Sequence, residues 1–226
     1  MTTNGNDSPL LLTVAVLGGT GKEGSGLAMR WAINGYRVII GSRDAERAMT
    51  HAGELNTELG VDVLQGKDNA SAAAEAQLVV VAVPYAAHRA TLESVKDQLQ
   101  GKILVDITVP NQPPDITTVW VPPGNSTALE AQEIVGAGVR VVSAFHSISH
   151  TKLKKLDQPI ESDVFVCGDD ADAKQDVIHL VEAAGMRGVD AGPLKNSVAS
   201  ESLAAVMIYI NKTYKVKGAG IRIVGL

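Results

Sequence analysis

The sequence has only one cysteine, Cys167, in 226 residues, so it cannot form an internal disulfide, and a cysteine-rich metal site is not expected. It has no uninterrupted stretch of about 18 apolar residues, and Met1–Pro9 is polar, so we predict neither a membrane span nor a standard secretion signal. It also lacks an excess of basic residues, because the net charge is −5, which argues against a nucleic-acid partner. These absences predict a cytoplasmic globular protein.

An apolar run from Leu10 to Leu17 leads directly into a glycine-rich turn. The turn consists of Gly18, Gly19, Thr20, Gly21, Lys22, Glu23 and Gly24. The apolar positions that follow have the spacing of one buried helix face. Glycines let a backbone approach a pyrophosphate closely, and the helix N-terminus after them offers free N–H groups to this anion. The order of strand, turn and helix therefore predicts a dinucleotide site, the alternative being a structural turn without a ligand.

The end of the second apolar run, Val38 to Ile40, indicates which dinucleotide is bound. An NAD site usually has an acidic residue about 20 positions after the glycines, where it binds the ribose 2′-hydroxyl. Here the chain continues with Gly41, Ser42 and Arg43, and Arg47 follows one helical turn later. A hydroxyl and two guanidinium groups suit a 2′-phosphate, so we predict NADP. The alternative is that Ser42 caps a helix beginning at Arg43, with both arginines solvated.

The rest of the chain alternates between apolar runs and helical patterns. We expect strands near 61–64, 78–83, 103–107, 139–143 and 164–167, and helices near 44–59, 86–99, 126–135, 171–184 and 197–214. Strands that are apolar throughout indicate a parallel sheet covered on both faces. We therefore predict a doubly wound, Rossmann-type α/β fold, with an NADP-binding domain over 10–145 and a small C-terminal α/β lobe over 146–226. The Pro-rich segment 110–125 is expected to be a long irregular connection.

Ligands of such sheets bind at the carboxyl ends of the strands, and one titratable side chain, His146, lies at such an end. It is our candidate catalytic acid, the alternative being a histidine that anchors its loop to backbone carbonyls. Three further histidines, His51, His88 and His179, fall within predicted helices, and we expect them at the surface. No known ligand spacing appears among the histidines, so we predict no metal site.

Several motifs together resemble the NADPH-dependent reductases of the deazaflavin coenzyme F420, from about Leu11 to Ile223. They are Gly18–Gly21, Gly41–Arg43, Val81–Pro84, Val141–His146, Cys167–Asp170, Asp190–Leu194 and Glu201–Leu203. The resemblance implies hydride transfer between NADP(H) and F420, with F420 as the small-molecule acceptor, and a homodimer.

The resemblance also implies roles for particular residues. Gly19, Thr20, Gly21, Lys22 and Glu23 would form the pyrophosphate turn, Ser42, Arg43 and Arg47 would bind the 2′-phosphate, Val83 and Pro84 would border the nicotinamide, and His146, Ile148, Ser202 and Met207 would line the deazaflavin pocket. Val198 and Ala204 stand where well-known members have an arginine and a threonine, which makes the acceptor side more apolar. The alternatives are an NADPH-dependent reductase of a flavin or another small conjugated substrate, and a non-catalytic NADPH-sensing module.

Overall fold

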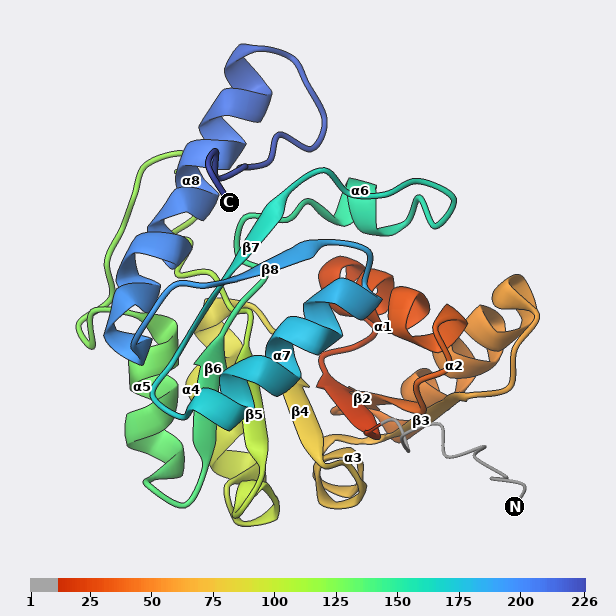
Figure 1. Ribbon diagram of the computed structural model, residues 1–226. Coiled ribbons are helices and arrows are strands. Elements are labelled where there is room, and N and C mark those ends of the chain that lie inside the picture. Colours follow the sequence, from red (N-terminus) through yellow and green to blue (C-terminus); the bar gives the residue numbers. More distant parts are fainter. Residues whose placement is uncertain (1–11) are drawn as a thin grey trace, which may run out of the picture.

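A computed structural model describes residues 12–226, so Met1–Pro9 and the start of the expected first strand at Leu10 lie outside the described residues. These described residues form an eight-stranded sheet with helices on both faces (Figure 1). The strands are β1 Val14–Leu17, β2 Val38–Ser42, β3 Leu64–Asp68, β4 Leu78–Val81, β5 Ile103–Asp106, β6 Arg140–Ser143, β7 Asp163–Gly168 and β8 Arg187–Asp190. The predicted doubly wound α/β fold is confirmed.

The strand order is β3-β2-β1-β4-β5-β6-β7-β8, and every neighbouring pair is parallel except β6 and β7. The chain runs outward from β1 to β3 and then returns to place β4 on the other side of β1. This reversal leaves a crevice at the carboxyl ends of β1 and β4, which is where open α/β sheets bind ligands. The C-terminal strands β7 and β8 continue the same sheet.

The helices are α1 Lys22–Ile33, α2 Ala45–Leu59, α3 Asn69–Glu75, α4 Tyr85–Val95, α5 Thr127–Val135, α6 His150–Leu153, α7 Ala171–Ala183 and α8 Ser197–Thr213, with short 3-10 turns at Asp97–Leu99 and Leu194–Asn196. Helices α1, α2 and α7 pack on one face of the sheet, and α3, α4 and α5 pack on the other (Figure 1). None of the helices in residues 12–226 is long and apolar enough to cross a membrane.

Each face of the sheet has its own apolar core. Along β1, Val14 and Val16 face the α1 side, whereas Ala15 and Leu17 face the α3 side, and all four are fully buried. This alternation follows from the two-residue repeat of a strand. Burial of a Val or Leu side chain contributes about 1.5–3 kcal/mol, so the central strands supply much of the stabilising free energy.

Two residues of α1 hold the C-terminal part of the chain against the first half. Buried Trp31 donates its Nε1–H to the Leu180 carbonyl at 2.9 Å, and its ring meets Phe145 edge-on. Buried Arg30 donates to five backbone carbonyls, those of Lys152, Leu153, Lys155, Gln158 and Ala184. Because these carbonyls come from α6, the loop after it and the end of α7, one side chain fixes the path of all three.

Two strands differ from the sequence-based expectation. The third strand begins at Leu64, whereas the apolar pattern suggested 61–64, and it extends through polar residues to Asp68. Strand β8, Arg187–Asp190, is not predicted from the sequence. The segment 110–125 is irregular, as expected, apart from one isolated bridge between Gln112 and Asp115.

Candidate functional site

The glycine turn after β1 has the backbone geometry that the sequence suggests. Gly18 has φ +77°, and a Cβ atom there would lie 2.6 Å from the Ala82 carbonyl oxygen. A Cβ atom on Gly19 would lie 2.8 Å from the Val16 oxygen, so side chains are excluded from both positions. Gly21 is the N-cap of α1 and supplies no side chain to bond the first N–H groups of the helix. These residues therefore fit a pyrophosphate, which such a helix end attracts.

A cavity of about 200 Å³ lies beside this turn, at the end of β2. Ser42, Arg43 and Arg47 line it together, and both arginines are exposed. The expected alternative, in which Ser42 caps the following helix, is wrong. Asp44 is the N-cap of α2 and accepts a hydrogen bond from the Arg47 N–H at 3.1 Å, whereas the Ser42 Oγ accepts from the Asp44 N–H at 3.2 Å. The Asp44 carboxylate is thus hydrogen-bonded to the first turn of α2. Ser42 and the two arginines border the same cavity.

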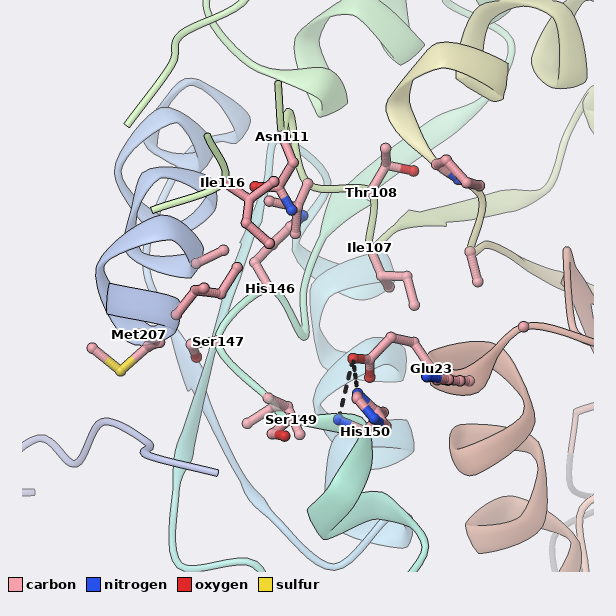
Figure 2. Close-up of a pocket in the computed structure, with 18 of the residues that line it drawn as sticks. Glu23, Ile107, Thr108, Asn111, Ile116, His146, Ser147, Ser149, His150 and Met207 are labelled. Atoms are coloured by element: carbon pink, nitrogen blue, oxygen red, sulfur yellow. Dashed lines mark hydrogen bonds and ion pairs between the residues drawn. The ribbon is translucent and has the colours of Figure 1, made fainter. Parts of the chain in front are cut away.

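A larger cavity, of about 660 Å³, continues from the turn across the carboxyl ends of β4, β5 and β6 to α8. Its wall is mainly apolar, with Ile107, Ile116, Ile148, Met207 and Ile208 among its lining residues. In Figure 2, Met207 of α8 lies on one side of this cavity, and Glu23 of α1 lies on the other. The volume and apolar character of this cavity suit flat conjugated rings.

Most of the predicted site residues line one of these two cavities. The larger cavity is lined by Gly21, Lys22, Glu23, Val83, Pro84, His146, Ile148 and Met207, and the smaller one by Thr20, Gly21, Ser42, Arg43, Arg47, Val83 and Pro84. Gly19 lies in the turn and packs near Ile40. Ser202 is not among the residues that line either cavity, because its hydroxyl donates to the Val198 carbonyl one turn earlier in α8. Ala204 is in the wall of the larger cavity.

His146 is buried in the wall of the larger cavity, and neither ring nitrogen has a hydrogen-bond partner among the described residues. The Thr108 backbone lies near the ring, but no contact to it meets the geometry of a hydrogen bond. Burial lowers the pKa of the imidazole to about 4, although the charge of Asp106 and the nearby Thr108 backbone oppose the shift. The ring is neutral at pH 7, and its nitrogens suit a hydrogen bond with a ligand.

The side chain of Glu23 meets His150 at the edge of the same cavity (Figure 2). The His150 backbone N–H donates to the Glu23 Oε1 at 3.1 Å, and the His150 Nδ1 lies 3.5 Å from that oxygen. Burial raises the pKa of Glu23 to about 7, while the hydrogen bond from His150 opposes the rise. This pair joins the first turn of α1 to the start of α6, and sequence spacing gives no sign of it because 127 positions separate the residues.

The expectation that His88 lies at the surface is wrong. It is 1% exposed, and its Nε2 lies 2.7 Å from the Asp106 Oδ2. The other carboxylate oxygen of Asp106 accepts from the Thr108 N–H at 2.9 Å. Burial opposes charge on the imidazole, but Asp106 more than offsets it and raises the pKa of His88. The pair therefore connects α4 to the end of β5, two residues before Thr108 of the larger cavity wall.

Comparison with known proteins shows which family the chain resembles. Residues 13–110 match the family described as "NADP oxidoreductase coenzyme F420-dependent". The F420-dependent NADP reductase of Methanocaldococcus jannaschii is 38% identical over 226 residues, covering 95% of this chain and 99% of that protein. The reductase of the same name from Methanothermobacter marburgensis is 37% identical over 224 residues, covering 95% of this chain and 99% of that protein.

Solved structures show the same fold at lower identity. A hypothetical protein from Sinorhizobium meliloti has a TM-score of 0.66 and 24% identity, over 81% of this chain and 86% of that chain. Identity at this level is evidence for the fold alone. The two reductases match at more than a third of positions over almost their entire length, and their similarity extends beyond the nucleotide-binding half. The chain therefore belongs to the family of F420-dependent NADP reductases.

Proposed function

We propose that this protein is an NADP-dependent oxidoreductase that transfers a hydride between NADP(H) and the deazaflavin coenzyme F420. The observation that carries the proposal is the junction of the two cavities, which share Gly21, Ala82, Val83 and Pro84 in their walls. The smaller cavity is lined by two arginines and the Ser42 hydroxyl, and the larger cavity has a mainly apolar wall. A nucleotide with a phosphate at one end and a planar ring at the other fits across this junction, and the larger cavity has room for a second ring.

The residues of the turn and of the smaller cavity bind the nucleotide. Gly21 and the free N–H groups of α1 bind the pyrophosphate, with Thr20 and Lys22 beside them. Ser42, Arg43 and Arg47 bind the 2′-phosphate through charge-assisted hydrogen bonds. When bound, NADPH supplies the hydride. Val83 and Pro84 border the nicotinamide, and Pro84 has no N–H that would need a partner in this apolar wall.

The residues of the larger cavity bind and orient the acceptor. Ile148 and Met207 pack against its ring system, and Ala204 leaves room where a longer side chain would fill the wall. His146 acts as a neutral imidazole that hydrogen-bonds the acceptor, because burial disfavours its charged form. Orientation and the exclusion of water are the main contributions of such a site, since the two coenzymes carry the redox chemistry.

In this proposal the C-terminal part, residues 146–226, closes the acceptor side of the NADP-binding domain of residues 10–145. We further propose a cytoplasmic homodimer. Exposed apolar side chains on α8 and just beyond it, Val206, Tyr209 and Tyr214, support an association of two copies. Sedimentation at two protein concentrations tests the assembly, and a monomer at both would contradict it.

The enzymatic proposal is tested by mixing the protein with NADPH and F420. We expect loss of the absorbance of oxidised F420 together with oxidation of NADPH, in a one-to-one ratio. Oxidation of NADPH with a flavin but not with F420 would instead identify a flavin reductase. Tight binding of NADPH without turnover of any acceptor would identify a sensing module.

A further inference from the structure

A buried carboxylate, Glu201, joins α8 to the beginning of α5. Glu201 is 2% exposed, and its two carboxylate oxygens accept hydrogen bonds from the backbone N–H groups of Thr127, at 2.7 Å, and Ala128, at 3.1 Å. These are the first two residues of α5, whose N–H groups have no acceptor within the helix. A second link lies beside the first, because the Ser197 hydroxyl donates to the Oγ of Ser126, the N-cap of α5, at 2.6 Å.

Helix α8 is also attached in its second half, where the Asn211 Oδ1 accepts hydrogen bonds from the Gly218 N–H at 3.0 Å and the Ala219 N–H at 2.9 Å. Its buried residues lie in its first half, and beyond them Tyr209 is exposed. In Figure 1, α8 extends past the end of the sheet, away from the two helix layers. The residues that line the acceptor cavity begin one turn after Glu201 and continue along the helix; they are Ala204, Met207, Ile208 and Asn211. Because these residues follow on the same continuous helix, a tilt of its first half would displace the cavity wall, so the attachment at Glu201 helps to set the position of this wall.

The surroundings of Glu201 are unusual for a carboxylate. The charges around it come from Asp106 of β5 and His88 of α4, with Tyr85 of α4 and Cys167 of β7 as further titratable neighbours. Burial is the main reason that the pKa of Glu201 is raised to about 8, and the charge of Asp106 adds to the rise. The bonds from Thr127 and Ala128 act in the opposite direction, since they stabilise the charged form. The strength of the attachment therefore changes with pH near neutrality.

We propose that Glu201 is a positioning residue for the acceptor, which holds α8 at the angle that forms the apolar cavity wall. It acts through the helix and does not line either cavity. The inference rests on the proposed function, because it assigns the larger cavity to the acceptor. Full ionisation gives both N–H groups a charged partner, so the wall is most firmly held above the pKa of this residue.

The test is Glu201→Gln, with Glu133→Gln on the exposed surface of α5 as the matched control. The amide retains one acceptor oxygen but turns an NH2 group toward the second backbone N–H. At about pH 9, where the parent carboxylate is charged, we expect the KM for F420 to rise about tenfold, which corresponds to one lost charge-assisted hydrogen bond. At this pH, kcat and the KM for NADPH should stay within about twofold. The control leaves all three constants unchanged. Equal increases in both KM values, or no increase, would overturn the inference.

Two further measurements separate positioning from a general structural role. In the parent protein, the KM for F420 should fall as pH rises through about 8, and this dependence should be absent from Glu201→Gln. Hydrogen exchange should be faster in the variant at the Thr127 and Ala128 amides and along α8, but not in β1. This second measurement needs no acceptor, so it distinguishes failure of the inference from failure of the proposed function. If Glu201→Gln does not fold, Ser197→Ala, which weakens the neighbouring link, is expected to give a smaller rise in the same KM.

Discussion

Replacement of both arginines of the smaller cavity, Arg43→Ala with Arg47→Ala, should weaken NADPH binding far more than NADH binding. A hydrogen bond to a charged group contributes about 1.5–3 kcal/mol, and the lower end applies here because both side chains are exposed. Two such losses amount to about 3 kcal/mol, or roughly 150-fold in the dissociation constant of NADPH at low salt. Ser42 remains in the variant, so the contact proposed between its hydroxyl and the 2′-phosphate is retained.

The assay is titration of the protein with each nucleotide, followed by the fluorescence of the reduced nicotinamide. NADH lacks the 2′-phosphate, so its affinity should change by no more than about twofold. Arg140→Ala is the control, because this exposed arginine begins β6 at the opposite end of the sheet from the cavities. The difference between parent and variant should shrink as salt is added, since the contacts are exposed to screening. An equal loss for both nucleotides would refute the assignment of these arginines to the phosphate.

Three further predictions concern the turn, the buried pair and the cavity histidine. Gly18→Ala should lower the free energy of unfolding in urea by about 1–3 kcal/mol, because the residue has φ +77° and the new Cβ would meet Ala82; an unchanged midpoint would contradict this reasoning. His88→Ala should destabilise the fold by about 3–5 kcal/mol by leaving Asp106 buried and unpaired, and a loss below about 1 kcal/mol would count against a buried ion pair. The pKa of His88 is raised on folding, so this pair stabilises the parent fully below about pH 6.5, and less as the pH rises through the folded pKa. The melting temperature of the parent should therefore fall over that pH range, and that of the variant should not. His146→Asn should leave the shape of the profile of kcat/KM against pH unchanged between about pH 5 and 9, because the pKa of about 4 keeps the ring neutral; a parent inflection near pH 6.5 that the variant lacks would be inconsistent with this.

The central strands and the nucleotide-binding turn could be predicted from the sequence because their causes are local. Strands buried on both faces have continuous apolar runs, as in Leu78–Val81, and the glycines are required by the backbone itself. The two strands that were misplaced or missed, Leu64–Asp68 and Arg187–Asp190, are the two edges of the sheet. An edge strand is covered less completely, and the side chains of both are mostly polar or half-buried, so the apolar signal is weak.

The polar residues behind the cavity could not be found in this way, because their partners lie on other elements. His88 occupies a position on α4 that spacing alone does not distinguish from a surface one, and Asp106 reaches it only after β5 is placed beside β4. Glu201 likewise depends on the approach of α8 to α5. By contrast, Arg43 and Arg47 are one turn apart on the same short segment, and their convergence was predicted.

The five carbonyl bonds of Arg30 have a mechanical consequence. They join α1, whose first turn lines the larger cavity, to the α6 segment, which begins at another side of the same cavity. Separation of α1 from α6 would break several of these bonds at once, so opening of the larger cavity along this side would cost several kcal/mol, at about 1.5–3 kcal/mol for each bond from a charged group. An opening of the larger cavity would then require displacement on another side, such as the one that α8 and the segment with Asn111 and Ile116 border.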